Sequence, residues 1–139
     1  MSTDTQAPRA TKPVTFNDDG IGEWTEDVVF EVTSERIAEY AAATNDPIEA
    51  HRKGEVAPPL FAVVPTFMSM APAAMEVAPV ELLMKLVHGK QYFVFHRPIA
   101  PGDVLTARAT AKGYDTVSTG TTVNIYCETR DAAGELVNE

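Results

Sequence analysis

The spacing of hydrophobic and polar positions changes several times along the chain, and these changes predict its elements. Trp24 to Val32 alternates with a period close to two, which indicates a strand. Apolar positions then recur at helical spacing behind a capping Thr33 or Ser34, which predicts a helix. We expect that helix to end at Asn45-Asp46-Pro47, because Pro47 disfavours helical geometry at Asp46.

The middle of the chain combines a predicted loop, residues 48–59, with a long apolar segment, residues 60–87. Three prolines interrupt the apolar segment: Pro65, Pro72 and Pro79. Because proline ends or kinks helices, we expect separate helical pieces here, one over 61–70 and another over 79–87.

The last third of the chain has the alternation and β-branched content of strands. We expect strands over 91–99, 104–112 and 121–130, and a further strand that begins at Leu136-Val137 after a hairpin turn. A hairpin needs its second strand to satisfy backbone groups, so either that strand is very short or the chain is a fragment. We favour the fragment, and an α+β fold class overall.

Length and composition fit one globular domain. The chain has 139 residues, of which 45% are hydrophobic and 22% are charged. Residues 1–20 lack periodicity and are expected to form a disordered N-terminal tail, which leaves 21–139 as the domain.

The net charge of −9 argues against nucleic acid and anionic membranes as partners. No unbroken run of about twenty apolar residues predicts a membrane span, and the N-terminus lacks an apolar signal core. We therefore expect a cytoplasmic protein. A phosphate-bearing molecule is still compatible with this charge, since Arg52-Lys53 forms a local pair of cations.

Several kinds of site have no support in the sequence. Cys127 is the single cysteine and excludes an internal disulfide; we interpret it as a strand residue. The histidines are not spaced as metal ligands, so we expect no metal. Glycine-rich nucleotide motifs and the nucleophile elbow are also missing.

Of the three histidines, His51 is the candidate for chemistry. His88 precedes Gly89 at a predicted helix end and His96 lies on an apolar strand, so both are expected to be structural. His51 follows Asp46 by five residues in a loop beside an apolar wall. A carboxylate and an imidazole that converge on one water can share acid and base work. From spacing alone, a solvated loop remains the alternative.

The order of these elements, with the turn Arg97-Pro98-Ile99-Ala100-Pro101-Gly102-Asp103-Val104-Leu105, resembles the MaoC-like hot-dog family from Trp24 onward. That family includes (R)-specific enoyl-CoA hydratases and 3-hydroxyacyl-thioester dehydratases. The loop Val56-Ala57-Pro58-Pro59 also fits the resemblance. The segment Val87-His88-Gly89-Lys90-Gln91 is similar to the N-terminal dehydratase-type half of such enzymes.

The resemblance implies a hot-dog fold, an antiparallel sheet wrapped around a central helix, here without its last strand. It implies that Asp46 and His51 are catalytic and activate water for addition across a 2-enoyl thioester, or expel it in reverse. Backbone N–H groups at the start of the central helix would hold the thioester oxygen. The substrate would be a CoA or acyl-carrier-protein thioester, with no other cofactor. We expect the acyl group to contact four residues: Val56, Pro59, Phe61 and Met68.

Two departures from the family pattern bear on activity. Ile48-Glu49 stands where active members carry a loop-shaping Asn-Pro pair. Ala57-Pro58-Pro59 stands where active members carry a glycine whose N–H serves the oxyanion hole, and proline has no N–H to donate.

These departures favour the acyl-binding half of a double or heterodimeric hot-dog hydratase/dehydratase. The first alternative is a self-sufficient homodimeric (R)-enoyl-CoA hydratase that uses Asp46 and His51. The second is an acyl-CoA thioesterase or a non-catalytic binding module.

Overall fold

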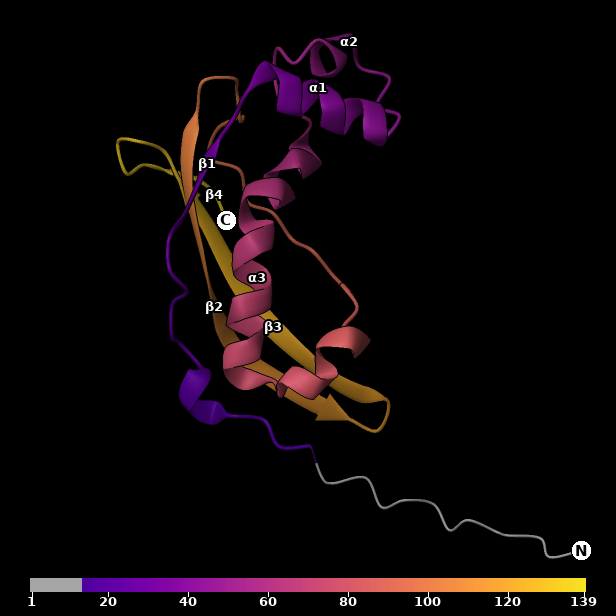
Figure 1. Cartoon of the computed structure of the whole chain (residues 1–139), viewed down its shortest axis with the longest axis vertical. Helices are drawn as coiled ribbons and strands as arrows, with labels where there is room; N and C mark the ends of the chain where they lie inside the picture. Colours follow the sequence, from indigo (N-terminus) through magenta and orange to yellow (C-terminus); the bar gives the residue numbers. More distant parts are fainter. Residues whose placement is uncertain (1–13) are drawn as a thin grey trace, which may run out of the picture.

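A computed structural model describes residues 14–139. Four antiparallel strands form one sheet in the order β1-β2-β3-β4: β1 (Val28–Glu31), β2 (Val104–Val117), β3 (Gly120–Arg130) and β4 (Leu136–Asn138). The helix α3 (Val63–Val77) lies along one face of this sheet (Figure 1). The predicted α+β hot-dog architecture, an antiparallel sheet around a central helix, is therefore confirmed.

Small side chains let α3 approach the sheet closely. Leu105, Ala107, Ala109 and Ala111 on β2 are fully buried, and the intervening Thr106 and Arg108 are more exposed, although Thr110 is buried as well. This period-two pattern turns one face of β2 toward the helix. Larger apolar groups gather around Phe61, whose ring makes edge contacts with the rings of Phe30 and Tyr40; the core cluster comprises Val32, Ile37, Ala57, Phe61, Ala62, Ile99, Leu105 and Val137.

The prediction that prolines divide residues 60–87 into separate helices is wrong for α3. Pro65 lies in the first turn, where N–H groups have no partner within the helix in any case. Pro72 lies inside the helix, but it is exposed, so water can reach the carbonyl that it leaves without a hydrogen bond. After α3 the chain forms only a 3₁₀ turn, Val80–Lys85, where we expected a helix.

The helical stretch Pro59–Val77 passes a length and hydropathy test for crossing a membrane, with 19 residues and a mean hydropathy of 1.5. Packing against β2 and β3 gives an alternative reason for its apolar character, since the core helix of a sheet protein meets the same test.

Two further expectations need correction. Residues 91–99 form only a short antiparallel bridge, between Phe95 and Asn138 of β4, and not the predicted strand. Val94 and Glu139 exchange two backbone hydrogen bonds, and the His96 N–H donates to the Val137 carbonyl. The predicted loop 48–59 contains a short helix, α2 (Glu49–Arg52), because this segment closes hydrogen bonds at helical spacing.

The predicted boundary after residue 20 falls inside a packed segment. Residues 1–13 lie outside the described part of the chain. Asn17 donates its N–H to the Val77 carbonyl, and Gly20 packs against the backbone of Glu76 at the end of α3. The ring of Phe16 stacks on Tyr114. Residues 16–20 thus belong to the folded domain.

Cys127 lies partly buried on β3, and burial raises the pKa of its thiol to about 11. The thiol therefore stays protonated near neutral pH. We predict that a thiol reagent at pH 8 modifies folded protein about two orders of magnitude more slowly than urea-unfolded protein. Equal rates, followed by absorbance of the released chromophore, would contradict the burial of this side chain.

Candidate functional site

The end of helix α1 (Ser34–Ala43) places the Asp46 backbone. Asn45 adopts a left-handed conformation with φ of 53°, and its N–H donates to the Ala42 carbonyl. The Asp46 N–H donates to the Ala41 carbonyl at 2.9 Å. These two bonds form a Schellman motif, which satisfies the last carbonyls of the helix and fixes where the Asp46 side chain emerges.

The Asp46 carboxylate then organises the turn into α2. Its Oδ1 accepts a hydrogen bond from the Ile48 N–H at 2.8 Å, across Pro47. This is an Asx turn, in which a side chain replaces a backbone acceptor. Helix α2 begins at Glu49, one residue after Ile48, and its first turn places His51 beside Asp46. Local hydrogen bonding therefore shapes this loop without the Asn-Pro pair of active relatives.

Gly54 lets the segment after α2 lie against the start of α1. Its φ is +70°, and a Cβ at this position would collide with the backbone carbonyl of Ser34. Only glycine fits such a close approach with a left-handed backbone. Gly54 thus helps to hold α2, and His51 with it, against α1.

We predict that Gly54→Ala lowers the free energy of unfolding by about 3 kcal/mol, from backbone strain plus the collision. Gly134→Ala is the matched control: Gly134 has φ of +81° but no atom near its Cβ position, so strain alone costs about 1–2 kcal/mol. Urea unfolding of both variants measures the difference. Equal losses would contradict the close packing of Gly54 on Ser34.

The structure brings the two predicted catalytic residues together. His51 Nδ1 lies 2.8 Å from Asp46 Oδ2, and the side chains are 11% and 14% exposed. The pair is thus a hydrogen-bonded, largely buried dyad rather than a solvated loop. Each Asp46 oxygen has a protein donor, so the Nε2 nitrogen of His51 is the position left for a reacting group.

The Asp46 carboxyl has a pKa below its usual value of 3.8, first because of the Ile48 N–H bond and second because of the His51 bond. Desolvation acts in the opposite direction and is outweighed. Asp46 is therefore ionised near neutral pH. An ionised partner fixes the proton of His51 on Nδ1 in the neutral ring and stabilises the charged ring.

Because the pKa of Asp46 is lower in the folded than in the unfolded chain, ionisation of Asp46 stabilises the fold above the usual carboxyl range. That stabilisation is lost as pH falls below about 3.8 and through the lower folded-state pKa. We predict that Asp46→Asn is less stable than wild type at pH 7 and that the gap narrows at pH 3. Urea midpoints at both pH values measure it; a gap that widens in acid would contradict the assignment.

The four predicted acyl contacts do not share one cavity. Val56 is half-buried and Pro59 is exposed. Phe61 is 1% exposed and lies in the core, whereas Met68 is 66% exposed on α3. Pro59 alone of the four lines a described depression, of about 340 Å³, whose other lining residues are Ala57, Pro58, Phe95, His96, Arg97, Pro98 and Ile99.

The arginine-to-aspartate turn of the family resemblance has a structural role here. Arg97 forms a two-pronged ion pair with Asp103, at 2.8 and 3.2 Å, and Asp103 also accepts the Ala100 N–H. The Ala57 N–H donates to the Ile99 carbonyl at 2.9 Å. The turn therefore fixes one wall of the 340 Å³ depression beside the Ala57-Pro58-Pro59 segment.

The sequence did not reveal how two backbone groups shape the site. These are the Ile48 N–H, which binds Asp46, and the backbone of Gly54, which packs closely on Ser34. A glycine two residues after the end of a short helix, as Gly54 is after α2, is an ambiguous indication by itself. A second depression, of about 510 Å³, lies on α2 and is lined by Pro47, Glu49, Arg52 and Lys53. Over residues 14–139, no group of three His, Cys, Asp or Glu side chains is placed to hold a metal ion.

Residues 19–139 match the family model described as "FAS1-like, dehydratase domain region". A UPF0336 protein of Thermobifida fusca (strain YX) is 34% identical over 121 residues, which covers 78% of this chain and 78% of that protein. The UPF0336 protein SCO4636 of Streptomyces coelicolor is 32% identical over 119 residues, with coverage of 78% and 79%.

Solved structures share the fold. A MaoC-like dehydratase from Rhodospirillum rubrum superposes with a TM-score of 0.63 at 17% identity, covering 88% of this chain and 90% of that one. The C-terminally truncated HadBC (3R-hydroxyacyl-ACP dehydratase) complex from Mycobacterium tuberculosis gives 0.57 at 21% identity, with coverage of 91% and 89%.

The sheet wrapped on a central helix and these matches define a hot-dog protein of the MaoC-like type. Within that class, the chain belongs to the FAS1-like dehydratase domain family.

Proposed function

We propose that this chain is a hydratase/dehydratase of 2-enoyl and 3-hydroxyacyl thioesters whose own Asp46–His51 dyad transfers the proton. The observation that carries the proposal is the 2.8 Å bond between two largely buried side chains. It favours the self-sufficient enzyme over the acyl-binding half, because the loop keeps dyad geometry despite Ile48-Glu49.

The ionisation of Asp46 assigns the roles within the dyad. A carboxylate with a lowered pKa is a poor proton donor, so His51 both removes and returns the proton. In hydration, His51 Nε2 takes a proton from water while the water oxygen bonds to C3 of the enoyl group. The C2=C3 electron pair moves toward the thioester, and C2 then takes a proton from Nε2. Atoms and charge balance without a redox cofactor.

The thioester would reach this site as a CoA or acyl-carrier-protein conjugate. Backbone N–H groups near the start of the 3₁₀ turn Pro59–Ala62 and of α3 would donate hydrogen bonds to the developing oxyanion. Pro58 and Pro59 supply no N–H there, and loss of one donor costs about two to three orders of magnitude in rate. We therefore expect slow turnover.

A partner hot-dog subunit would complete the site. Large apolar side chains are exposed on α3 and the segment after it, with exposed fractions from 36% to 92%: Phe67, Met68, Met75, Leu83, Met84, Val87 and Tyr92. We name these seven residues the apolar face. Contiguous apolar patches on a protein surface commonly mark an interaction site, and exposed large apolar side chains this numerous on neighbouring segments are candidates for one. We propose that a second copy covers it, in the cytoplasm, and that it brings Met68 into contact with the acyl group.

One specific observation favours a second candidate, the acyl-binding half of a heterodimer. In the Ala57-Pro58-Pro59 segment the two prolines have no N–H and the Ala57 N–H already donates to the Ile99 carbonyl, so none of the three is free to hold an oxyanion. The 340 Å³ depression that this segment lines is partly apolar. In that case Asp46 and His51 would stabilise the loop, and a partner subunit would carry out the chemistry.

The experiment follows two products of the purified chain with crotonyl-CoA. Hydration removes the conjugated double bond and leaves the thioester intact, so the enoyl absorbance falls while no free thiol forms. Equal formation of free thiol would instead identify a thioesterase and overturn the proposal. Binding without either product would favour the acyl-binding half.

A further inference from the structure

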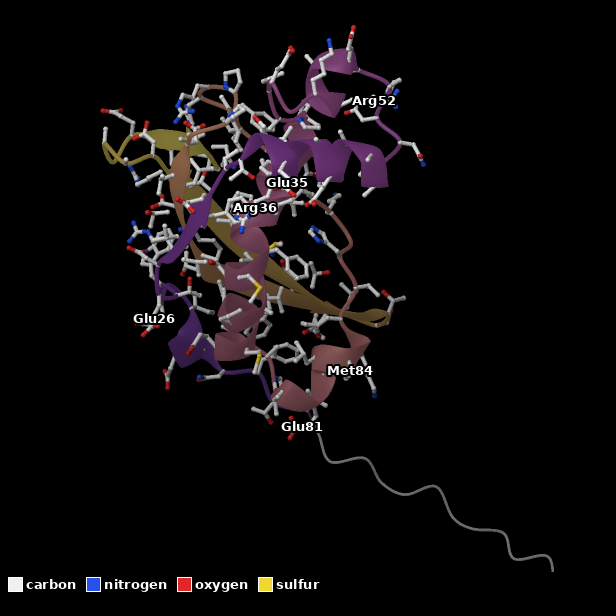
Figure 2. The ribbon with its side chains drawn as sticks, turned by 45° about the horizontal axis from the view of Figure 1, so that its top comes forward. Glu26, Glu35, Arg36, Arg52, Glu81 and Met84 are labelled. Carbon is white, nitrogen blue, oxygen red and sulfur yellow. The ribbon has the colours of Figure 1, made fainter. Side chains whose placement is uncertain are left out.

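The 510 Å³ depression on α2 is lined by residues that adjoin Asp46 and His51 in sequence, and most of these lining residues are charged. It is about 510 Å³ in volume, and its charged lining residues are Glu49, Arg52 and Lys53, a net charge of about one positive on a chain of net charge −9. Figure 2 shows Arg52 at the end of the molecule that carries α1 and α2, away from Met84 at the other end.

Arg52 is unusual among the basic side chains of residues 14–139, because no hydrogen bond, ion pair or cation–π contact joins it to another described side chain. Seven of the nine basic residues in this range have such partners: Arg36, Lys53, Lys90, Arg97, Arg108, Lys112 and Arg130. The other exception is Lys85. Arg52 is thus an exposed guanidinium available to an anion from outside the chain.

Lys53 can bind the same anion as Arg52 with little loss of folding free energy. Its pair with Glu49 is 2.7 Å long, but the side chains are 58% and 78% exposed. Ion pairs that water reaches this freely contribute little to stability, so an incoming anion can displace the carboxylate. A guanidinium fork matches two phosphate oxygens, and a neighbouring ammonium adds a point charge.

We propose that Arg52, assisted by Lys53, binds a phosphate group of the thiol carrier that delivers the thioester to the dyad. The inference rests on the proposed function. His51 and Arg52 are consecutive on α2, so their side chains diverge by about 100° around the helix. The reacting acyl group and the carrier would then lie on different sides of α2. The flexible pantetheine arm would join them.

The test measures the affinity of the full chain for three butyryl thioesters, which have no double bond to hydrate. Butyryl-pantetheine has no phosphate, butyryl-4′-phosphopantetheine has the phosphate shared by CoA and acyl carrier protein, and butyryl-CoA adds the nucleotide phosphates. We expect Arg52→Gln to weaken binding of phosphate-bearing thioesters about tenfold and to leave butyryl-pantetheine unchanged. Lys85→Gln is the matched control and should change none of them.

An effect already present with butyryl-4′-phosphopantetheine would assign Arg52 to the arm phosphate, and an effect confined to butyryl-CoA to the nucleotide phosphates. If Arg52→Gln weakens all three thioesters equally, or none, the inference is wrong while the proposed function stands. If wild type binds no thioester at all, the proposed function fails and the inference fails with it.

Discussion

Replacing His51 with alanine is expected to lower kcat for crotonyl-CoA hydration by about two to four orders of magnitude, the usual contribution of a positioned acid–base group. The reason is that Nε2 is the position of the dyad left open to substrate, since Nδ1 is bonded to Asp46. Asp46→Asn should also reduce kcat, because an amide neither fixes the ring tautomer as an ionised carboxylate does nor stabilises the charged ring.

His88→Ala is the control for this substitution. His88 is exposed and makes no hydrogen bond to another residue of the 14–139 range, so its loss should leave kcat unchanged. Circular dichroism and urea unfolding of each variant would separate lost chemistry from lost folding. A folded His51→Ala protein with wild-type kcat would exclude the proposed role.

Phe67→Glu is expected to convert a dimer into a monomer. Phe67 is 64% exposed on the apolar face, and aromatic side chains at the centre of an interface commonly contribute 2 kcal/mol or more. A buried, unpaired carboxylate adds a desolvation penalty. The dimer dissociation constant should therefore rise by at least about thirtyfold, as measured by sedimentation equilibrium.

Val29→Glu provides a matched control for the loss of an exposed apolar group. Val29 is 66% exposed on β1, and its neighbour Phe30 contacts the core, so Val29 faces the opposite side of the sheet from α3. This variant should remain dimeric. If wild type is monomeric at 100 µM, or if Phe67→Glu dimerises as wild type does, a second copy does not cover the apolar face.

The sequence predicted the parts of the fold that depend on repeating patterns. Alternation located β1, β2 and β3, and helical spacing located α1, because each pattern follows directly from which side chains are buried. Pro72 misled the reasoning, since its effect on a helix depends on whether water reaches the freed carbonyl. Residues 91–99 formed only a short bridge despite their composition, because strand formation needs a partner and β4 covers only Leu136–Asn138.

The candidate site was predictable in identity but not in geometry. The spacing of Asp46 and His51 marked both residues, and a loop was the natural interpretation of the residues around them. The dyad is set by the Asn45 conformation, the Ile48 amide and the Gly54 approach to Ser34, which are backbone features with weak sequence indications. The predicted acyl contacts were scattered, because apolar character alone does not distinguish core Phe61 from exposed Met68.

Turnover by the purified protein, with no other subunit present, tests most directly whether the Asp46–His51 dyad of this chain does its own chemistry. Crotonyl-CoA hydration should be measured at protein concentrations where the chain is dimeric, against His51→Ala under the same conditions. We expect slow but measurable turnover by wild type and its loss in the variant. A wild-type dimer that binds crotonyl-CoA but forms no 3-hydroxybutyryl-CoA would contradict this expectation.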